Sequence, residues 1–113
     1  MALPKEGQLL RIFIGESDKF QGKPLYEWIV QQAREKGLAG ATVLRGIEGF
    51  GRASRIHTAK IVRLSEDLPV VIEIVDVPEK IEPFVALVDQ VIDGGLVTVE
   101  HVKVRLYRSK KEE

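Results

Sequence analysis

Apolar and polar residues alternate along several segments of the chain, and this alternation predicts β-strands. In the first segment, Gln8 to Ile14, both faces carry apolar side chains, with Leu10 on one face and Phe13 on the other. A strand with two apolar faces is expected to be covered on both sides. A second strand is predicted over Ala41 to Ile47. The third, Val70 to Val75, is rich in β-branched residues, which favour strands.

The last alternating segment, Val97 to Tyr107, predicts a fourth strand. Its alternation changes phase near His101 and Val102. A β-bulge, or two separate pairing segments, would produce such a shift. The six residues after it, Arg108 to Glu113, form a charged tail.

Two further segments repeat apolar residues at helical spacing. The first follows Pro24, which suits the first turn of a helix because its missing N–H is not needed there, and Gly37 ends it after Lys36. The second runs from Pro78 to Ile92, where Pro83 near the start predicts a break or kink in the first turn. The apolar stripes are Leu25, Trp28, Ile29 and Ala33 in the first, and Ile81, Val85, Val88 and Ile92 in the second.

The remaining segments read as connections. Glu16 to Lys23 is polar and contains a glycine, which predicts a loop. Gly49 to Lys60 shows no consistent period and is predicted to be a long exposed loop. Ile61 to Leu64 fits a short strand or a helical turn, and Asp93 to Gly95 fits a turn.

The predicted order, βαββαβ, is that of the ferredoxin-like split βαβ arrangement, an α+β fold with two helices on one face of an antiparallel sheet. Two helices cover only one face, although the first and third strands are apolar on both. No further element of the chain is left to cover the second face. We therefore expect a homo-oligomer in which sheets pack against sheets, for which a trimer is a common solution.

Composition narrows the possible classes of protein. The 113 residues suit one domain, residues 1–108, followed by the tail 109–113. Seventeen basic and seventeen acidic residues cancel, which disfavours a nucleic-acid binder. Without cysteine there is no disulfide, thiolate metal site or cysteine nucleophile. The start of the chain lacks the apolar stretch of a signal peptide, so we expect a cytoplasmic protein. The absence of Asn and Cys among many charged residues is typical of heat-adapted proteins.

Candidate binding chemistry is concentrated in Gly49-Phe50-Gly51-Arg52 and the basic residues that follow. Glycines let the backbone approach a ligand closely, and bare N–H groups beside Arg52 and Arg55 could hold a phosphate. The alternative is a tight turn carrying solvated charges. Gly94-Gly95 is open to the same two interpretations.

Catalytic and metal-binding patterns are weaker. His57 and His101 lie far apart with no third ligand at a useful spacing, so surface or structural histidines are the preferred interpretation. Ser65-Glu66-Asp67 resembles a helix cap or turn. No nucleophile with a paired base can be placed, and we do not expect an enzyme.

Several motifs resemble those of the PII nitrogen-regulatory signalling proteins. They are Gly37, Gly40, Thr42 and Val43, then Gly49-Phe50-Gly51-Arg52, then Leu68-Pro69 and Ile72-Glu73-Ile74-Val75. The runs GLAGATVLRGIEGFG, SEDLPVVIEIVD and GLVTVEHV are more closely similar to an uncharacterised bacterial and archaeal PII-like family. The resemblance covers nearly the whole chain.

The resemblance implies a trimer that binds an adenine nucleotide (ADP, ATP or AMP) in clefts between subunits, and a loop that then docks onto a target such as a membrane transporter. It implies that Thr42 contacts the base and that residues 49–52 lie near the phosphates. Gly94 and Gly95 match the phosphate-facing turn. Arg105, or alternatively Lys103 or Arg108, supplies a guanidinium or ammonium group from a neighbouring chain, although an intersubunit ion pair is an equal alternative for Arg105. Arg55, His57 and Lys60 fall in the docking loop.

The chain also departs from the PII pattern. The PII turn has glycines around an aspartate and then a lysine, whereas this chain has Asp93-Gly94-Gly95-Leu96. One extra residue separates Thr42 from Gly49, and no tyrosine lies between Tyr26 and Tyr107, which argues against uridylylation. Two alternatives remain open: a trimeric metal-handling protein of similar fold, and an enzyme with its site at the subunit interface.

Overall fold

The first predicted strand, β1 (Glu6–Gly15), lies in the middle of the molecule and pairs on both sides. In this computed structural model, residues 6–50, 57–58, 67–108 and 110 are described. β1 pairs antiparallel with β7 (Pro69–Asp76) on one side and with β8 (Leu96–Lys103) on the other. The short β4 (Thr42–Arg45) pairs antiparallel with β7. The sheet order is therefore β4-β7-β1-β8.

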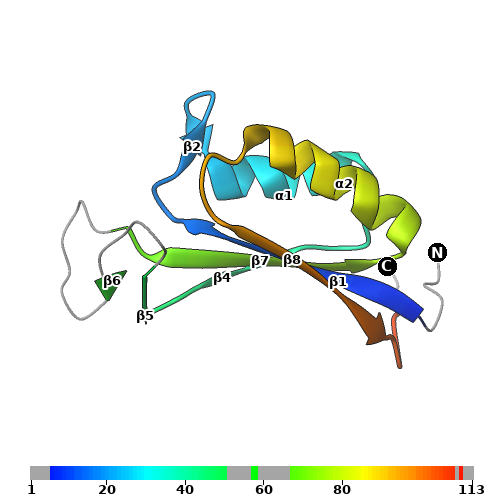
Figure 1. Ribbon diagram of the computed structural model, residues 1–113. Helices are drawn as coiled ribbons and strands as arrows, with labels where there is room; N and C mark the ends of the chain where they lie inside the picture. The colour runs from blue at the N-terminus through cyan, green and yellow to red at the C-terminus, as the bar shows by residue number, and fades with distance from the viewer. Residues whose placement is uncertain (1–5, 51–56, 59–66, 109, 111–113) are drawn as a thin grey trace.

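Both described helices lie on the same face of this sheet, and none of the described segments forms a helix on the opposite face (Figure 1). They are α1 (Leu25–Glu35) and α2 (Pro78–Val91). The fold is α+β and ferredoxin-like, as the hydrophobic pattern predicted. Gly37 has a φ of 78° just after α1, the left-handed conformation that commonly ends a helix.

The core lies between the helices and one face of the sheet. Alternate residues of β1 and β7 point into it, as the period of two requires. In α2 the buried stripe contains Phe84 in place of the predicted Val85, which is only partly buried. The buried apolar residues are Leu10, Ile12, Ile14, Leu25, Ile29, Ala33, Val70, Ile72, Ile74, Ile81, Phe84 and Val88.

The loop predicted over residues 16–23 contains a small hairpin. It consists of β2 (Lys19–Phe20) and β3 (Lys23–Pro24), and its turn has positive φ at Gln21 and Gly22. The prediction that Pro24 lies in the first turn of the helix was therefore wrong: Pro24 ends β3 and is the residue before α1. Phe20 packs edge-on against Trp28, with 4.8 Å between ring centroids.

Three other predictions of local structure were wrong. The last strand ends at Lys103 instead of Tyr107, and its register with β1 is unbroken, so the phase change marks the end of pairing and not a bulge. The second strand is shorter than Ala41 to Ile47. The helix after Pro78 continues without a break through Pro83.

The segment predicted to be a long loop begins with a two-residue ladder. β5 (Glu48–Gly49) pairs antiparallel with β6 (His57–Thr58). Other predictions for this region, namely Gly51, Arg52, Arg55, Lys60 and the element at 61–64, lie outside the described residues, as does most of the tail 109–113.

Candidate functional site

The sheet face opposite the helices, here called the open face, is patterned in rows that cross the strands. The pairing registers place Leu44, Val71, Phe13 and Leu96 side by side in one apolar row. Leu44 and Leu96 at the two ends of this row are 49% and 55% exposed. The next row is polar and contains Thr42, Glu73, Arg11 and Thr98. Exposed apolar rows of this length are typical of surfaces that bind a ligand or another protein surface.

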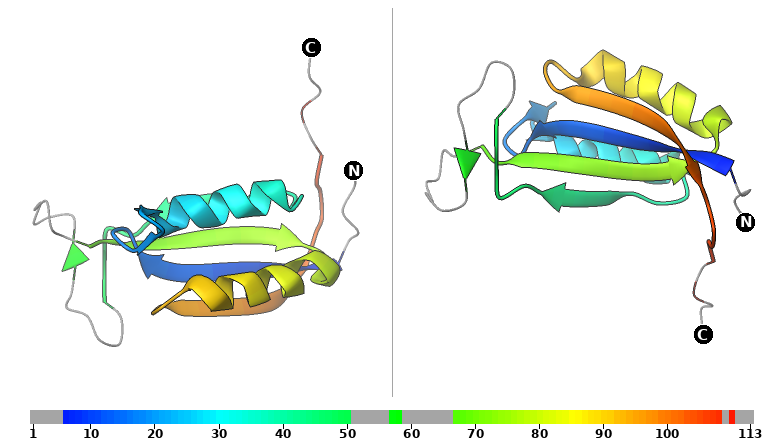
Figure 2. Two further views of the ribbon diagram at one scale, coloured as in Figure 1. Left: turned by 90° about the horizontal axis from the view of Figure 1, so that it is seen from above. Right: turned by 60° about the horizontal axis from the view of Figure 1, so that its bottom comes forward.

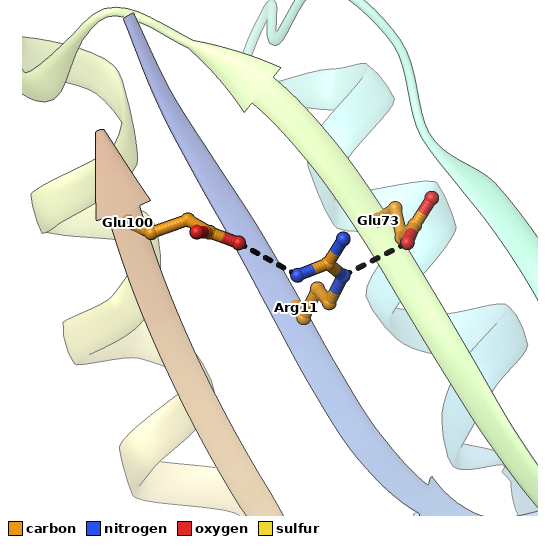
Figure 3. A network of polar contacts seen from close by, with 3 residues as sticks. All are labelled: Arg11, Glu73 and Glu100. Atoms are coloured by element: carbon orange, nitrogen blue, oxygen red, sulfur yellow. Dashed lines mark hydrogen bonds and ion pairs between the residues drawn. The ribbon is translucent and has the colours of Figure 1, made fainter. Parts of the chain in front are cut away.

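A charged network occupies the middle of the open face and joins three strands (Figure 3). The Arg11 Nε donates to Glu73 at 2.9 Å, and its Nη1 donates to Glu100 at 2.7 Å. The hydrogen bond to Glu73 is the largest cause that raises the pKa of Arg11 above its ordinary value, and Glu100 acts in the same direction. A raised pKa means that Arg11 loses its charge only at strongly alkaline pH. The network therefore keeps its cation throughout the physiological range.

A groove of about 620 Å³ lies on the open face where β8 ends. Leu9 and Val75 from the central strands supply apolar lining, and Glu73 adds a carboxylate. One wall consists of Ala39 to Ala41 in the α1–β4 connection and of Thr42 at the start of β4. The other wall is the segment Val102 to Tyr107. Grooves of this size with an apolar lining and a few polar groups are typical small-molecule sites.

The segment Val104–Arg108, here called the arm, leaves the sheet on the side away from the helices (Figures 1 and 2). It then reaches the α1–β4 connection, where the Tyr107 hydroxyl donates to the Ala39 carbonyl at 3.3 Å. Arg105 lies in the arm and lines the groove, although Arg108 does not. The arm thus brings the Arg105 guanidinium to the groove that Thr42 lines, although the two residues are 63 positions apart in the sequence.

The α1–β4 connection is held in place by a buried carboxylate. Asp76 is 1% exposed and accepts hydrogen bonds from the backbone N–H groups of Ala39 at 2.9 Å and Val77 at 2.7 Å. Lys80 donates from its Nζ to the Gly37 carbonyl at 2.9 Å. The wall of the groove is therefore fixed to the end of β7 and the start of α2.

The predicted glycines lie at the other end of the sheet. Gly95 has a φ of 147°, and a Cβ there would approach the Phe13 carbonyl oxygen to 2.5 Å. Gly49 lies beside Pro69 at the start of β7, where a Cβ would be 3.1 Å from the proline ring. β1 lies between these two places, because it pairs with both β7 and β8. Four residues of β1, about 14 Å at the usual rise, separate this end from Leu9 in the groove.

The structure thus brings together some predicted site residues and separates others. Thr42 and Arg105 line one groove. Gly49, Gly94 and Gly95 lie at the end of the sheet remote from this groove. Phe50, which follows Gly49, is 72% exposed. For His57 only the backbone pairing with Gly49 is described.

The comparisons with known proteins identify the family. A family model, DUF190 (Uncharacterized ACR, COG1993), matches residues 7–104. The chain belongs to the DUF190 family. It is 45% identical over 100 residues to a UPF0166 protein of Aquifex aeolicus (strain VF5), covering 86% of this chain and 91% of that protein. It is also 37% identical over 95 residues to UPF0166 protein MJ1524 of Methanocaldococcus jannaschii, covering 83% and 87%.

The fold of this DUF190 protein is similar to the folds of two solved structures. CPII, a nitrogen regulatory PII-like protein from Thiomonas intermedia K12, was solved bound to ADP, AMP and bicarbonate, and is similar with a TM-score of 0.64, 16% identity and 88% of each chain covered. A second CPII structure, bound to ADP and bicarbonate, gives a TM-score of 0.63, 17% identity and the same coverage. The DUF190 chain therefore has a PII-like fold, as its motifs indicated.

A second hollow, of about 830 Å³, lies on the DUF190 protein between α1 and the edge strand β4. Tyr26, Val30 and Val43 line it together with charged residues of the helix, and none of the predicted site residues does. Within the described parts of the chain, no three His, Cys, Asp or Glu residues gather as a metal would require. Neither of the described helices is long and apolar enough to cross a membrane.

Sequence reasoning missed several residues of the site in this DUF190 protein. Glu73 and Tyr107 line the groove, and Arg11 and Glu100 form the network beside it. Alternation in β1 and β7 could have placed Arg11 and Glu73 on the same face, since both interrupt an apolar face. Nothing in the local pattern indicates that Tyr107 reaches Ala39, 68 residues away.

Proposed function

We propose that this DUF190 protein is a PII-like regulatory protein that binds an adenine nucleotide in clefts between the subunits of a homotrimer. The observation that carries the proposal is the groove that contains both Thr42 and Arg105. Its apolar lining of Leu9 and Val75 suits an aromatic base, and the arginine suits a phosphate. The structures of CPII bound to ADP and AMP support the choice of nucleotide.

The separation of the two half-sites supports a cleft between subunits. In one chain, Gly49 and Gly95 lie at the end of the sheet remote from the groove, with β1 between them. A neighbouring copy could bring its glycine turns to the groove of the first. We propose that backbone N–H groups at Gly94 and Gly95 and at residues 49–52 contact the phosphates, while Thr42 and Arg105 come from the adjacent subunit.

Signalling is proposed to proceed through the loop of residues 49–60, which docks onto a target protein such as a membrane transporter by way of Arg55, His57 and Lys60. A nucleotide shifts the loop only if it binds one loop conformation better than another. A hundredfold preference would supply about 2.7 kcal/mol, within the usual range of allosteric coupling. Retention of a target from cell extract should then depend on the nucleotide added and be lost in an Arg55→Ala/Lys60→Ala variant.

Calorimetric titration with ATP, ADP, AMP and cyclic nucleotides tests the binding proposal. We expect saturable binding of at least one adenine nucleotide. Arg105→Gln should weaken that binding about tenfold or more, since a hydrogen bond to a charged group contributes about 1.5–3 kcal/mol. Arg108→Gln is the matched control, because Arg108 is exposed in the same arm and does not line the groove. Absence of binding with every nucleotide would overturn the proposal.

A further inference from the structure

The charged network of the open face has a role that nucleotide binding does not require. On the four strands, the side chains facing this way include one cation, Arg11, and two carboxylates, Glu73 and Glu100. The strand side chains on this face therefore sum to a charge of one minus two, or −1, not counting Arg105 of the arm. Without Arg11 the same strand side chains would sum to −2. Both carboxylates would then lack the partner that they have at 2.9 and 2.7 Å.

We infer that Arg11 makes the open face able to be buried against a second copy of this chain, because it neutralises Glu73 and Glu100 within its own subunit. This inference rests on the self-association that is part of the proposed function. Burying an unpaired carboxylate is strongly unfavourable, so a face holding two of them would stay in water. A guanidinium with several donors is suited to satisfying both at once.

The second copy is the occupant that fits this face best. The apolar row at one end of the face, with Leu44 and Leu96 about half exposed, requires an apolar surface that is as wide as four strands. No element of the described chain covers it (Figure 1). The polar row beside it requires a partner that adds no unmatched charge. The same face of another copy offers an apolar row of equal width and a polar row that is already paired internally.

The pairing geometry favours neutralisation within the subunit over pairing between subunits. Arg11 lies on the central strand, and its two carboxylate partners lie on the two strands beside it, β7 and β8 (Figure 3). The Arg11 and Glu73 side chains are only 36% and 32% exposed before any partner is added. Both hydrogen-bond distances, 2.9 Å to Glu73 and 2.7 Å to Glu100, are already in the normal range. Arg11 of each copy is already paired with its own Glu73 and Glu100, so it is not left over to pair with a carboxylate of the second copy.

Sedimentation equilibrium on the full chain tests the inference by comparing four proteins. Arg11→Met should weaken self-association by about a hundredfold or more relative to the unchanged chain. Glu100→Gln brings the strand side chains of this face to zero net charge and should associate at least as tightly as the unchanged chain. The triple variant R11M/E73Q/E100Q removes all three charges and should recover association to within about tenfold. Arg34→Met, an exposed charge on α1 remote from this face, should have no effect.

Each outcome supports or overturns the inference. It is overturned if Arg11→Met associates normally, if Glu100→Gln dissociates as Arg11→Met does, or if the triple variant stays dissociated. The second outcome would show that Glu100 pairs between subunits. Circular dichroism of each variant separates loss of folding from loss of association, and the triple variant remains informative if Arg11→Met does not fold. A monomeric unchanged chain would instead overturn the self-association in the proposed function.

Discussion

At the scale of single residues, the groove depends on a carboxylate that no ligand would touch. Asp76 is buried and uses one oxygen for the Ala39 N–H and the other for the Val77 N–H. It therefore fixes the wall that carries Thr42 while satisfying a donor at the start of α2. Buried polar groups of this kind are costly to leave unpaired.

Replacement of this carboxylate should destabilise the protein. Asp76→Ala leaves the two N–H groups without their acceptor and should lower the free energy of unfolding by about 1–3 kcal/mol, measured by urea denaturation. Asp89→Ala, at an exposed position of α2, is the control and should change it by less than about 0.5 kcal/mol. Equal stability of the two variants would show that the buried contacts of Asp76 contribute little.

The glycine turn before β8 allows a similarly matched comparison. A Cβ at Gly95 meets the Phe13 carbonyl oxygen at 2.5 Å in a backbone conformation that L side chains rarely adopt, whereas a Cβ at Gly94 meets nothing within 4 Å. Gly95→Ala should therefore lower the free energy of unfolding by about 1–3 kcal/mol. Gly94→Ala should leave it nearly unchanged. If Gly94→Ala nevertheless reduces nucleotide affinity in calorimetry, the close approach at that turn serves a ligand.

At the scale of elements, the arm forms one wall of the groove, so its position sets the shape of the groove. Among the described residues it makes no sheet pairs after Lys103, and the Tyr107 hydroxyl anchors it by a hydrogen bond to the Ala39 carbonyl. Such a segment, with few backbone hydrogen bonds to the sheet, opens at a lower free energy than the strands do. The arm can therefore adjust around a ligand while β8 stays paired.

A change in the arm should therefore affect binding more than folding. Tyr107→Phe removes the hydroxyl that contacts Ala39 and should weaken nucleotide binding several-fold in calorimetry, since a neutral hydrogen bond contributes about 0.5–1.5 kcal/mol. The melting temperature should change little, because the hydroxyl is at the surface. Tyr26→Phe, on the other side of the molecule in the second hollow, is the control. An unchanged affinity in Tyr107→Phe would mean that the arm is not part of the binding site.

At the scale of the whole molecule, we expect the stability of the folded chain to depend on self-association through the open face. An apolar row left in water contributes nothing to folding, but the same row buried against another copy stabilises the folded state through mass action. The melting temperature should therefore rise with protein concentration over the micromolar range, as measured by calorimetry. A melting temperature independent of concentration, with a single species in sedimentation, would contradict assembly through this face.

The features that the sequence predicts well are those that depend on residues close together in the chain. The order of strands and helices, the ferredoxin-like fold and the end of α1 at Gly37 all follow from local periodicity and glycine conformation. Phe84 was missed because Val85 fits a helical stripe nearly as well when the position of the sheet is unknown. The small hairpin of β2 and β3 was missed because two-residue strands are too short to show a period.

The site is less predictable than the fold because its parts are distant in sequence. Thr42 and Arg105 were predicted from motif resemblance, and the structure brings them to one groove. The separation of that groove from Gly49 and Gly95 depends on strand order, which no single motif contains. The network of Arg11 with Glu73 and Glu100 spans 62 and 89 residues. Only the assembled sheet shows it.

The central position of β1 has a consequence for biosynthesis. β1 is synthesised before both of its neighbours, β7 and β8, which begin at Pro69 and Leu96. The middle of the sheet is therefore incomplete until β8 has been synthesised, and such long-range pairing slows folding and exposes strand edges. A nascent chain halted after Gly94 would leave one edge of β1 bare, and we expect it to aggregate or be degraded when released.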